Sequence, residues 1–111
     1  MHWTTLGESV IGTSHLSRQL PCQDAHCVLP FGEGGNWLVI AVADGAGSAA
    51  FSQVGARLVC DALVRLVVEI PESCRCTRAS VIGAVARARE ELLIEADRLN
   101  ISARELACTA L

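Results

Sequence analysis

Apolar residues follow two different spacings along the chain. Residues 37–43, "WLVIAVA", form an uninterrupted apolar run, which is typical of a strand covered on both faces. After Gly47 the apolar residues recur every three or four positions, which predicts an amphipathic helix over residues 51–70 that Pro71 closes. The opposite side of this helix carries alternating arginines and acids four residues apart, a spacing that stabilises an exposed helix face.

A second helical stripe follows Thr77, a suitable N-cap, and continues to Leu99, where Asn100 can end the helix. Residues 105–111, "ELACTAL", then have the composition of a strand that is just beginning. The chain ends inside this predicted strand. We therefore expect residues 1–111 to be the amino-terminal part of one larger domain.

The first third of the chain predicts strands and turns. Residues 2–16 alternate short apolar stretches with glycines and hydroxyls, which favours one or two strands with a turn near Gly12. Residues 25–31 predict a further strand, which the glycine-rich loop 32–36 joins to the apolar run as a hairpin. The order strands, helix, helix, strand predicts an α+β fold with two long antiparallel helices packed side by side on an antiparallel sheet.

Composition narrows the class of protein. The chain is 51% apolar and 19% charged, with a net charge of −3, and its nine basic residues are scattered arginines. We expect no nucleic-acid binding, which needs a basic face, and no membrane span, which needs about 20 consecutive apolar residues. Of the six cysteines none has the spacing of a CxxC redox motif, and no signal peptide precedes the first strand. These features indicate a reducing, cytoplasmic location.

The apolar run ends on an acid, Asp44, in the stretch "VADGAGSAA", and three interpretations compete for it. Asp-Gly is a strong hairpin signal, but a helical pattern follows rather than a strand. Gly45, Gly47 and Ala50 satisfy the G-x-G-x-x-A dinucleotide fingerprint. A carboxylate directly before the first glycine is unfavourable beside a pyrophosphate, and the acid expected about 20 residues on would lie at the end of a helix.

The third interpretation is a metal site. A carboxylate at the rim of a buried strand is well placed to bind a hard divalent cation, and Gly45 leaves its carbonyl oxygen approachable as a second ligand. A second acid is needed, and Asp24 in "PCQDAH" can reach the same end of the sheet if the hairpin forms. The competing interpretation of Asp24 is an Asx-turn residue in a loop.

The motifs "SHLSRQLPCQDA" and "VADGAGSAAFSQVGARL", followed by two helices and "ACTAL", resemble a bacterial branch of the type 2C, metal-dependent protein phosphatases. The order and approximate spacing of the motifs agree over nearly the whole chain. The resemblance implies the amino-terminal half of an antiparallel β-sandwich flanked by helix pairs. It departs from the family pattern at Gln23, where an acid is usual, and at Ala46, where His or Met is usual.

The resemblance also implies roles for individual residues. Asp44 would bridge two Mn²⁺ or Mg²⁺ ions, Gly45 would offer its carbonyl, and Asp24 would reach the ions directly or through water. Arg18 would correspond to the family's phosphate-binding arginine. No side chain would be a catalytic nucleophile, because a metal-activated water attacks the phosphorus of a phosphoserine or phosphothreonine in a protein substrate.

We therefore expect the amino-terminal portion of a metal-dependent Ser/Thr protein phosphatase that is inactive alone, because the family's later aspartates lie beyond this sequence. Two other hypotheses stay open. The chain could be an inactive fragment or a non-catalytic phosphatase-like module, or it could be a nucleotide-binding domain that uses Gly45, Gly47 and Ala50.

Overall fold

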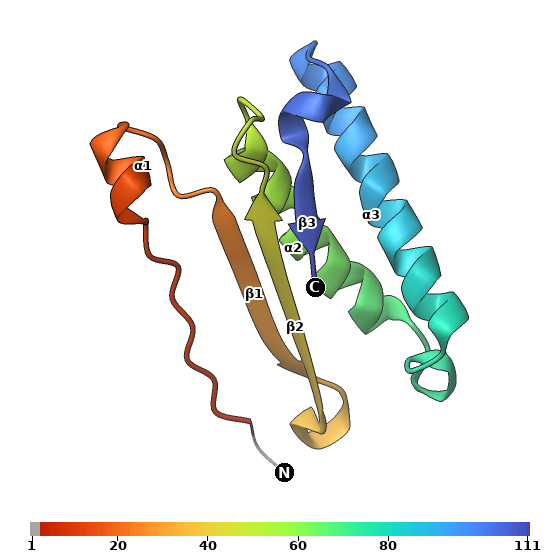
Figure 1. Cartoon of the computed structure of the whole chain (residues 1–111). Coiled ribbons are helices and arrows are strands. Elements are labelled where there is room, and N and C mark those ends of the chain that lie inside the picture. Colours follow the sequence, from red (N-terminus) through yellow and green to blue (C-terminus); the bar gives the residue numbers. More distant parts are fainter. Residues whose placement is uncertain (1–2) are drawn as a thin grey trace.

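The computed structural model describes residues 3–111 as three strands and three α-helices with short 3₁₀ turns between them (Figure 1). The elements in chain order are α1 (Thr13–Ser17), β1 (Asp24–Phe31), β2 (Trp37–Gly45), α2 (Ser52–Glu69), α3 (Arg78–Leu99) and β3 (Cys108–Ala110). The turns η1 (Glu33–Gly35), η2 (Glu72–Cys74) and η3 (Ala103–Leu106) lie in the connections. The predicted α+β class is confirmed, with one antiparallel sheet of order β1-β2-β3.

The register of the β1–β2 hairpin places its two acidic residues opposite each other. Asp24 pairs with Asp44 at one end, and Phe31 pairs with Trp37 at the other, next to the loop. Because side chains alternate between the two faces of a strand, paired residues point to the same face. β3 continues this row, since Thr109 pairs with Asp44 on the other side of β2.

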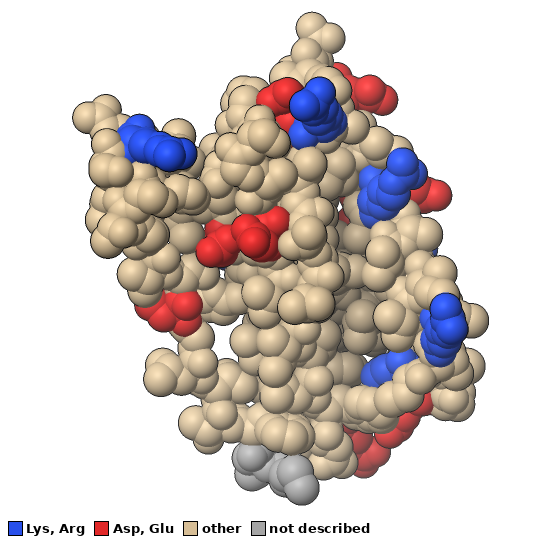
Figure 2. Space-filling view, in the orientation of Figure 1, with Lys and Arg blue, Asp and Glu red and all other residues tan. Residues whose placement is uncertain are grey.

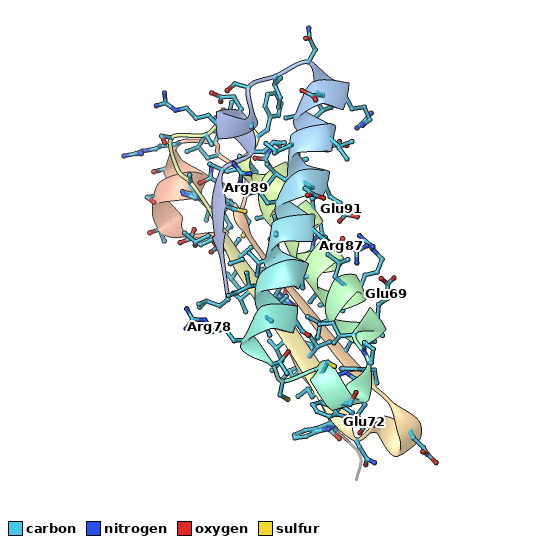
Figure 3. The ribbon with its side chains drawn as sticks, turned by 90° about the vertical axis from the view of Figure 1, so that its right-hand side faces the viewer. Glu69, Glu72, Arg78, Arg87, Arg89 and Glu91 are labelled. Atoms are coloured by element: carbon cyan, nitrogen blue, oxygen red, sulfur yellow. The ribbon has the colours of Figure 1, made fainter. Side chains whose placement is uncertain are left out.

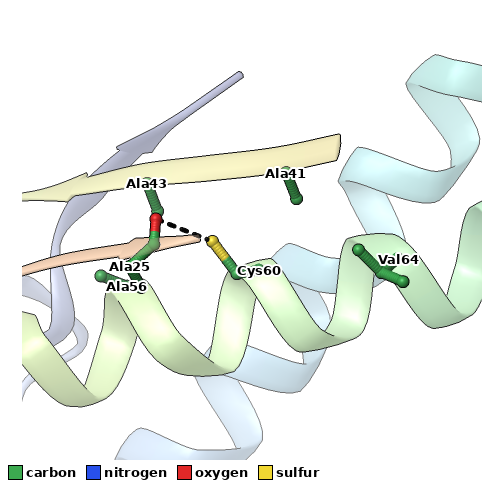
Figure 4. Close-up of a cluster of buried hydrophobic side chains, with 6 residues drawn as sticks. All are labelled: Ala25, Ala41, Ala43, Ala56, Cys60 and Val64. Atoms are coloured by element: carbon green, nitrogen blue, oxygen red, sulfur yellow. Dashed lines mark hydrogen bonds between the residues drawn. The ribbon is translucent and has the colours of Figure 1, made fainter. Parts of the chain in front are cut away.

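The core lies on one face of the sheet and is built from small side chains. Ala25, Ala41 and Ala43 of the hairpin pack against Ala56 and Cys60 of α2 (Figure 4). Cys60 is fully buried, and its thiol donates to the Ala25 carbonyl oxygen at 3.4 Å. Small residues allow the helix axis to approach the sheet closely, so larger side chains have no room here.

The two long helices form as their sequence pattern predicts. Thr77 caps α3 by accepting from the Ser80 amide, and Asn100 ends that helix in the left-handed conformation, with φ of 54°. Arg65 of α2 forms an ion pair with Glu91 of α3. A second buried cluster joins the two helices, and its members are Ala62, Leu66, Ala84 and Ala88.

The helices cover the sheet less completely than predicted. α2 packs against all three strands, whereas α3 packs mainly on α2 and η3 and lies beyond β3 in Figure 1. The expected cover on both faces of residues 37–43 is wrong for this structure, because Ile40 and Val42 are 56% and 43% exposed. An unbroken apolar run predicts a strand, but it does not show whether a second layer of structure covers that strand. The second sheet of the expected sandwich therefore stays a prediction.

The predicted strands over residues 2–16 are also wrong for the described residues. Residues 3–12 are extended without a pairing partner, and Thr13–Ser17 forms a short helix. Residue 2 lies outside the described range. A β-prone sequence becomes a strand only where a sheet edge offers backbone partners, and the pairings described here do not include this segment.

The far end of the hairpin is anchored to the connection between α2 and α3. The Arg75 guanidinium lies 4.7 Å from the ring centroids of both Phe31 and Trp37, within the range of cation–π attraction. The Trp37 indole donates to Glu72 at 3.0 Å, and Arg75 donates to the Ile70 carbonyl oxygen at 3.0 Å. These contacts hold the loop end of the hairpin in place.

Candidate metal centre

Asp24 and Asp44 lie side by side at the end of the sheet, on the face opposite to the one that α2 covers. They are cross-strand partners, and Figure 2 shows acidic side chains gathered over the ends of β1 and β2. The structure confirms the prediction that the 32–36 hairpin brings these two residues to the same end of the sheet. The interpretation of Asp24 as a loop residue is wrong, because it is the first residue of β1.

Gly45 joins this pair through the backbone. Its amide donates to the Gln23 carbonyl oxygen at 3.0 Å, which ties the residue before Asp24 to the residue after Asp44. A Cβ at position 45 would lie 2.7 Å from that oxygen and 2.8 Å from the Ser52 Cβ, so only glycine fits. The two aspartates are thereby held by a close backbone contact as well as by the strand ladder.

A cleft of about 730 Å³ opens beside the two carboxylates. Its walls come from the hairpin end, from α1 and from the start of β3, and they include His15, Gln23, Gly47 and Thr109. The Thr109 hydroxyl donates to the Asp44 carbonyl oxygen at 3.5 Å. Strand β3 therefore both pairs with Asp44 and forms one wall of the cleft.

The electrostatics of the pair favour a bound cation. The pKa of Asp24 is raised above its ordinary value of 3.8, first by desolvation of the carboxyl group and then by its hydrogen bond to Asp44 and the charge of Asp44. His15 acts in the opposite direction. The three ion pairs among the described residues all lie on α2 and α3, so neither aspartate has a side-chain cation partner there. A divalent cation would relieve the repulsion between the two carboxylates.

The donor set is suitable for a hard cation. Two carboxylates and a backbone carbonyl are the oxygen ligands that Mg²⁺ and Mn²⁺ prefer in proteins. Within residues 3–111, however, no group of three or more His, Cys, Asp or Glu side chains converges to hold a metal ion. The residues present therefore fit part of a metal site.

The other residues singled out in the sequence are placed differently. Arg18 ends α1 and is exposed, and it is not among the described residues that line the cleft, although Ser14 and His15 of the same helix are. No motif or spacing in the sequence pointed to His15, whose Nδ1 donates to the Pro21 carbonyl oxygen at 3.2 Å. Only the path of α1 brings it to the cleft.

His26 and Ser9 were also not predicted as part of the site's surroundings. His26 lies two residues after Asp24 on the same face of β1, and its Nδ1 shares a hydrogen bond of 2.7 Å with Ser9 Oγ. This bond fixes the extended segment 3–12 over the open face of the sheet, where a second cleft of about 780 Å³ also reaches both aspartates.

The nucleotide-binding interpretation of Gly45, Gly47 and Ala50 does not agree with the fold. That fingerprint needs parallel strands joined by a crossover helix. Here β2 is antiparallel to both of its neighbours, and α2 is unbroken as far as Glu69. The acid that the fingerprint requires on a second strand therefore has no place.

Similarity of the sequence to known proteins identifies the family of the chain. The sequence pattern of the family described as protein phosphatase 2C matches residues 11–111, and the chain belongs to this family. The chain is also 32% identical over 116 residues to Serine/threonine-protein phosphatase 3 of Escherichia coli (strain K12). That alignment covers 100% of this chain and 46% of the relative, so the chain spans a little under half of the relative's length. No solved structure matches the chain significantly.

Among the described residues, no helix combines the length and the apolar composition that a bilayer crossing requires.

Proposed function

We propose that this chain supplies Asp24, Asp44 and the Gly45 carbonyl to the Mn²⁺ or Mg²⁺ site of a Ser/Thr protein phosphatase. The observation that carries the proposal is the direct cross-strand pairing of Asp24 with Asp44 beside an open cleft. Membership of the protein phosphatase 2C family supports the reaction, the hydrolysis of phosphoserine or phosphothreonine in a protein substrate. We propose that further ligands come from the part of the domain that this chain does not span.

In this proposal the aspartates, Gly45 and Arg18 have separate roles. Asp24 and Asp44 bind the cations as carboxylates, and the backbone contact at Gly45 sets the distance between them. Bound cations would attract the phosphoryl oxygens and lower the pKa of water toward ~7. Arg18, at the end of the helix beside the cleft, is the candidate for binding the substrate phosphate, and its guanidinium would do so bidentately.

The cysteines support a cytoplasmic site of action. All six are free thiols, and the thiol of Cys60 is fully buried in the core. Burial raises the pKa of Cys60 and Cys108, which favours the unreactive thiol form. Free thiols in these numbers are typical of a reducing compartment.

The second candidate is a phosphatase-like module without catalytic activity. The observation that favours it is the lack of a third converging side-chain ligand among residues 3–111. Mn²⁺-dependent hydrolysis of p-nitrophenyl phosphate by the full-length protein decides between the two candidates. Hydrolysis that is lost in Asp44→Asn supports the phosphatase site, and its absence in the parent supports the module.

We test the proposal by isothermal titration of the chain with Mn²⁺ and Mg²⁺, comparing Asp44→Asn with the parent. Substitution of a residue that only orients a metal ligand typically weakens metal binding by about tenfold or more. Because Asp44 is proposed as a direct ligand, Asp44→Asn should weaken Mn²⁺ binding by at least this factor. Asp61→Asn is the matched control, since Asp61 is an exposed acid of α2 and pairs only with Arg57 among the described residues.

Two outcomes would contradict the proposal. The first is an Asp44→Asn chain that binds Mn²⁺ as tightly as the parent and the Asp61→Asn control. The second is hydrolysis of p-nitrophenyl phosphate by the parent at full rate in excess chelator. Metal-dependent hydrolysis by the 111-residue chain alone would show that no ligands beyond Asp24, Asp44 and Gly45 are needed.

A further inference from the structure

The connection 46–51 leads from the Asp44–Gly45 end of β2 into α2, and it is held by a segment more than fifty residues later in the chain. We propose that Glu105 is a positioning residue for the metal site, because its carboxylate fixes this connection and thereby Gly45 and Asp44. The inference rests on the proposed function for its metal-binding consequence, although the positioning itself can be tested without metal.

Three hydrogen bonds join the connection to the segment around Glu105. The Ala50 amide donates to Glu105 Oε2 at 2.8 Å, and the Phe51 amide donates to the Glu105 carbonyl oxygen at 2.9 Å. The Ala46 amide donates to the Ala107 carbonyl oxygen at 2.9 Å. Only the first of these bonds uses a side chain, so it is the bond that a substitution can remove.

The contact lies just before the start of α2. The N-cap residue of α2, Phe51, has no side chain that can accept a hydrogen bond from the first turn. The Glu105 carboxylate accepts from the Ala50 amide, the residue before this N-cap, and a negative charge near a helix N-terminus is favourable. Its position therefore serves both the hydrogen bond and the helix dipole.

Close packing carries the constraint from Glu105 to the aspartates. Leu106, the next residue, is fully buried, and a Cβ at Gly55 would lie 2.0 Å from its carbonyl oxygen, so η3 touches the first turns of α2. Ser52, at the start of α2, in turn packs against Gly45 so tightly that a Cβ there would meet it at 2.8 Å. A shift of the connection is thus transmitted directly to the residue that follows Asp44.

Loosening this contact should matter most for cation binding. Asp24 and Asp44 are cross-strand partners, so a cation that binds both carboxylates requires them to be held at a fixed separation. Groups that orient metal ligands typically change metal affinity by about 10- to 100-fold when they are removed. We expect Glu105 to behave as such a group.

The test uses the 111-residue chain and three substitutions. Glu105→Ala removes the acceptor, Glu105→Gln keeps an acceptor oxygen without the charge, and Glu90→Ala is the control at an exposed acid of α3. Glu105→Ala should weaken Mn²⁺ binding about tenfold or more, Glu105→Gln should restore most of it, and the control should bind as the parent does. If Glu105→Ala does not fold, Glu105→Asp gives the same comparison, because it withdraws the carboxylate by one methylene.

Amide hydrogen exchange in chelator separates positioning from simple helix capping. Loss of a local cap alone speeds exchange only at Ala50, whereas positioning predicts exchange about five- to tenfold faster at Gly45 and Ala46 as well. Unchanged exchange at these two amides, or an unchanged Mn²⁺ affinity in Glu105→Ala, would overturn the inference. If the parent binds no Mn²⁺, the proposed function fails for this chain, and the exchange data alone decide the role of Glu105.

Discussion

Asp24 and Asp44 are adjacent carboxylates, and their closeness should make stability depend on pH. The folded state raises the pKa of Asp24, chiefly through desolvation and then through Asp44, so over the range just above 3.8 the folded chain holds more protons than the unfolded chain. Without metal, the free energy of unfolding should therefore decrease as the pH rises from about 4 to 7 through this group. Cations bound at the proposed site would reverse this dependence, because they would need both carboxylates ionised.

We predict that Asp24→Asn makes the metal-free chain more stable at pH 7. The gain should be about 0 to 1 kcal/mol, because exposed charges are screened by solvent. Urea unfolding in chelator at pH 4 and pH 7 measures it, and the difference between variant and parent should be smaller at pH 4, where more of the parent carboxyl is protonated. A variant that is less stable than the parent at pH 7 would show that the two carboxylates do not repel each other in the folded chain.

For single residues of the site, the sequence predicts roles that depend on neighbouring positions, but it does not predict contacts between residues far apart in the chain. Asp44 stands out because it ends an apolar strand, and Asp24 follows from the hairpin that the loop 32–36 forms. Glu105 could not be found in this way, because its partner Ala50 is fifty-five residues away and its own surroundings look like the start of a strand. Contacts of this kind depend on the path of the chain through α2 and α3, and the spacing of residues in the sequence does not predict that path.

At the scale of elements, α2 meets η3 through a glycine. Gly55 is a buried helix residue, and a Cβ there would lie 2.0 Å from the Leu106 carbonyl oxygen, which is closer than two non-bonded atoms can approach. Gly83 in α3 is exposed, and a Cβ there would project into open space with no neighbour within 4 Å. The two glycines therefore provide a matched pair for testing how closely the helix and η3 approach.

We predict that Gly55→Ala and Gly83→Ala change stability in opposite directions. Gly55→Ala should destabilise the chain by about 1–3 kcal/mol, the usual cost of overpacking, because the backbone of Leu106 must move. Gly83→Ala should stabilise it by about 0.5–1 kcal/mol, since alanine is the better helix former. Thermal and urea unfolding measure both, and equal effects of the two substitutions would refute the close approach.

The long helices could be predicted because caps and apolar stripes are local signals. Thr77 and Asn100 mark the ends of α3 within a residue of where the structure has them. The segment 3–12 could not, because its β-prone residues need a partner strand, and the sheet described here offers none. Likewise, the run 37–43 is apolar on both faces, yet α2 covers only the face with Ala41 and Ala43.

At the scale of the whole molecule, two apolar surfaces are only partly covered by the described residues. One is the open face of the sheet around Ile40 and Val42. The other is a groove of about 650 Å³ between β3 and α3, lined by residues such as Val85 and Leu92, with Arg89 reaching toward β3 from the helix (Figure 3). Exposed apolar areas and a free strand edge favour association.

We predict that the 111-residue chain associates in solution and has low stability as a monomer. The exposed apolar side chains of the open sheet face and of the groove beside α3 are the surfaces that we expect to associate. Size exclusion with light scattering at several concentrations should show species larger than 11.7 kDa. Ile40→Lys should reduce their size, because it charges the open face.

Ile94→Lys is the control for this experiment, since Ile94 is 66% exposed on α3 and lines neither of the two apolar surfaces. It should leave the association unchanged. A monodisperse monomer with a single cooperative unfolding transition would contradict the prediction, and would mean that the core of small residues around Cys60 is sufficient by itself.

The number of residues in the loop 32–36 sets the register of the hairpin, and this register decides which residues face the cleft at the opposite end of the sheet. Three glycines with positive φ, Gly32, Gly34 and Gly35, form this loop, and Arg75 anchors both strands beside it. A strand that slips by a single residue exchanges its two faces, which would turn Asp24 toward the alanine core and bring Ala25 to the cleft. The loop's length is therefore under the same constraint as the two aspartates, and natural variation there should be limited to changes of residue type rather than number.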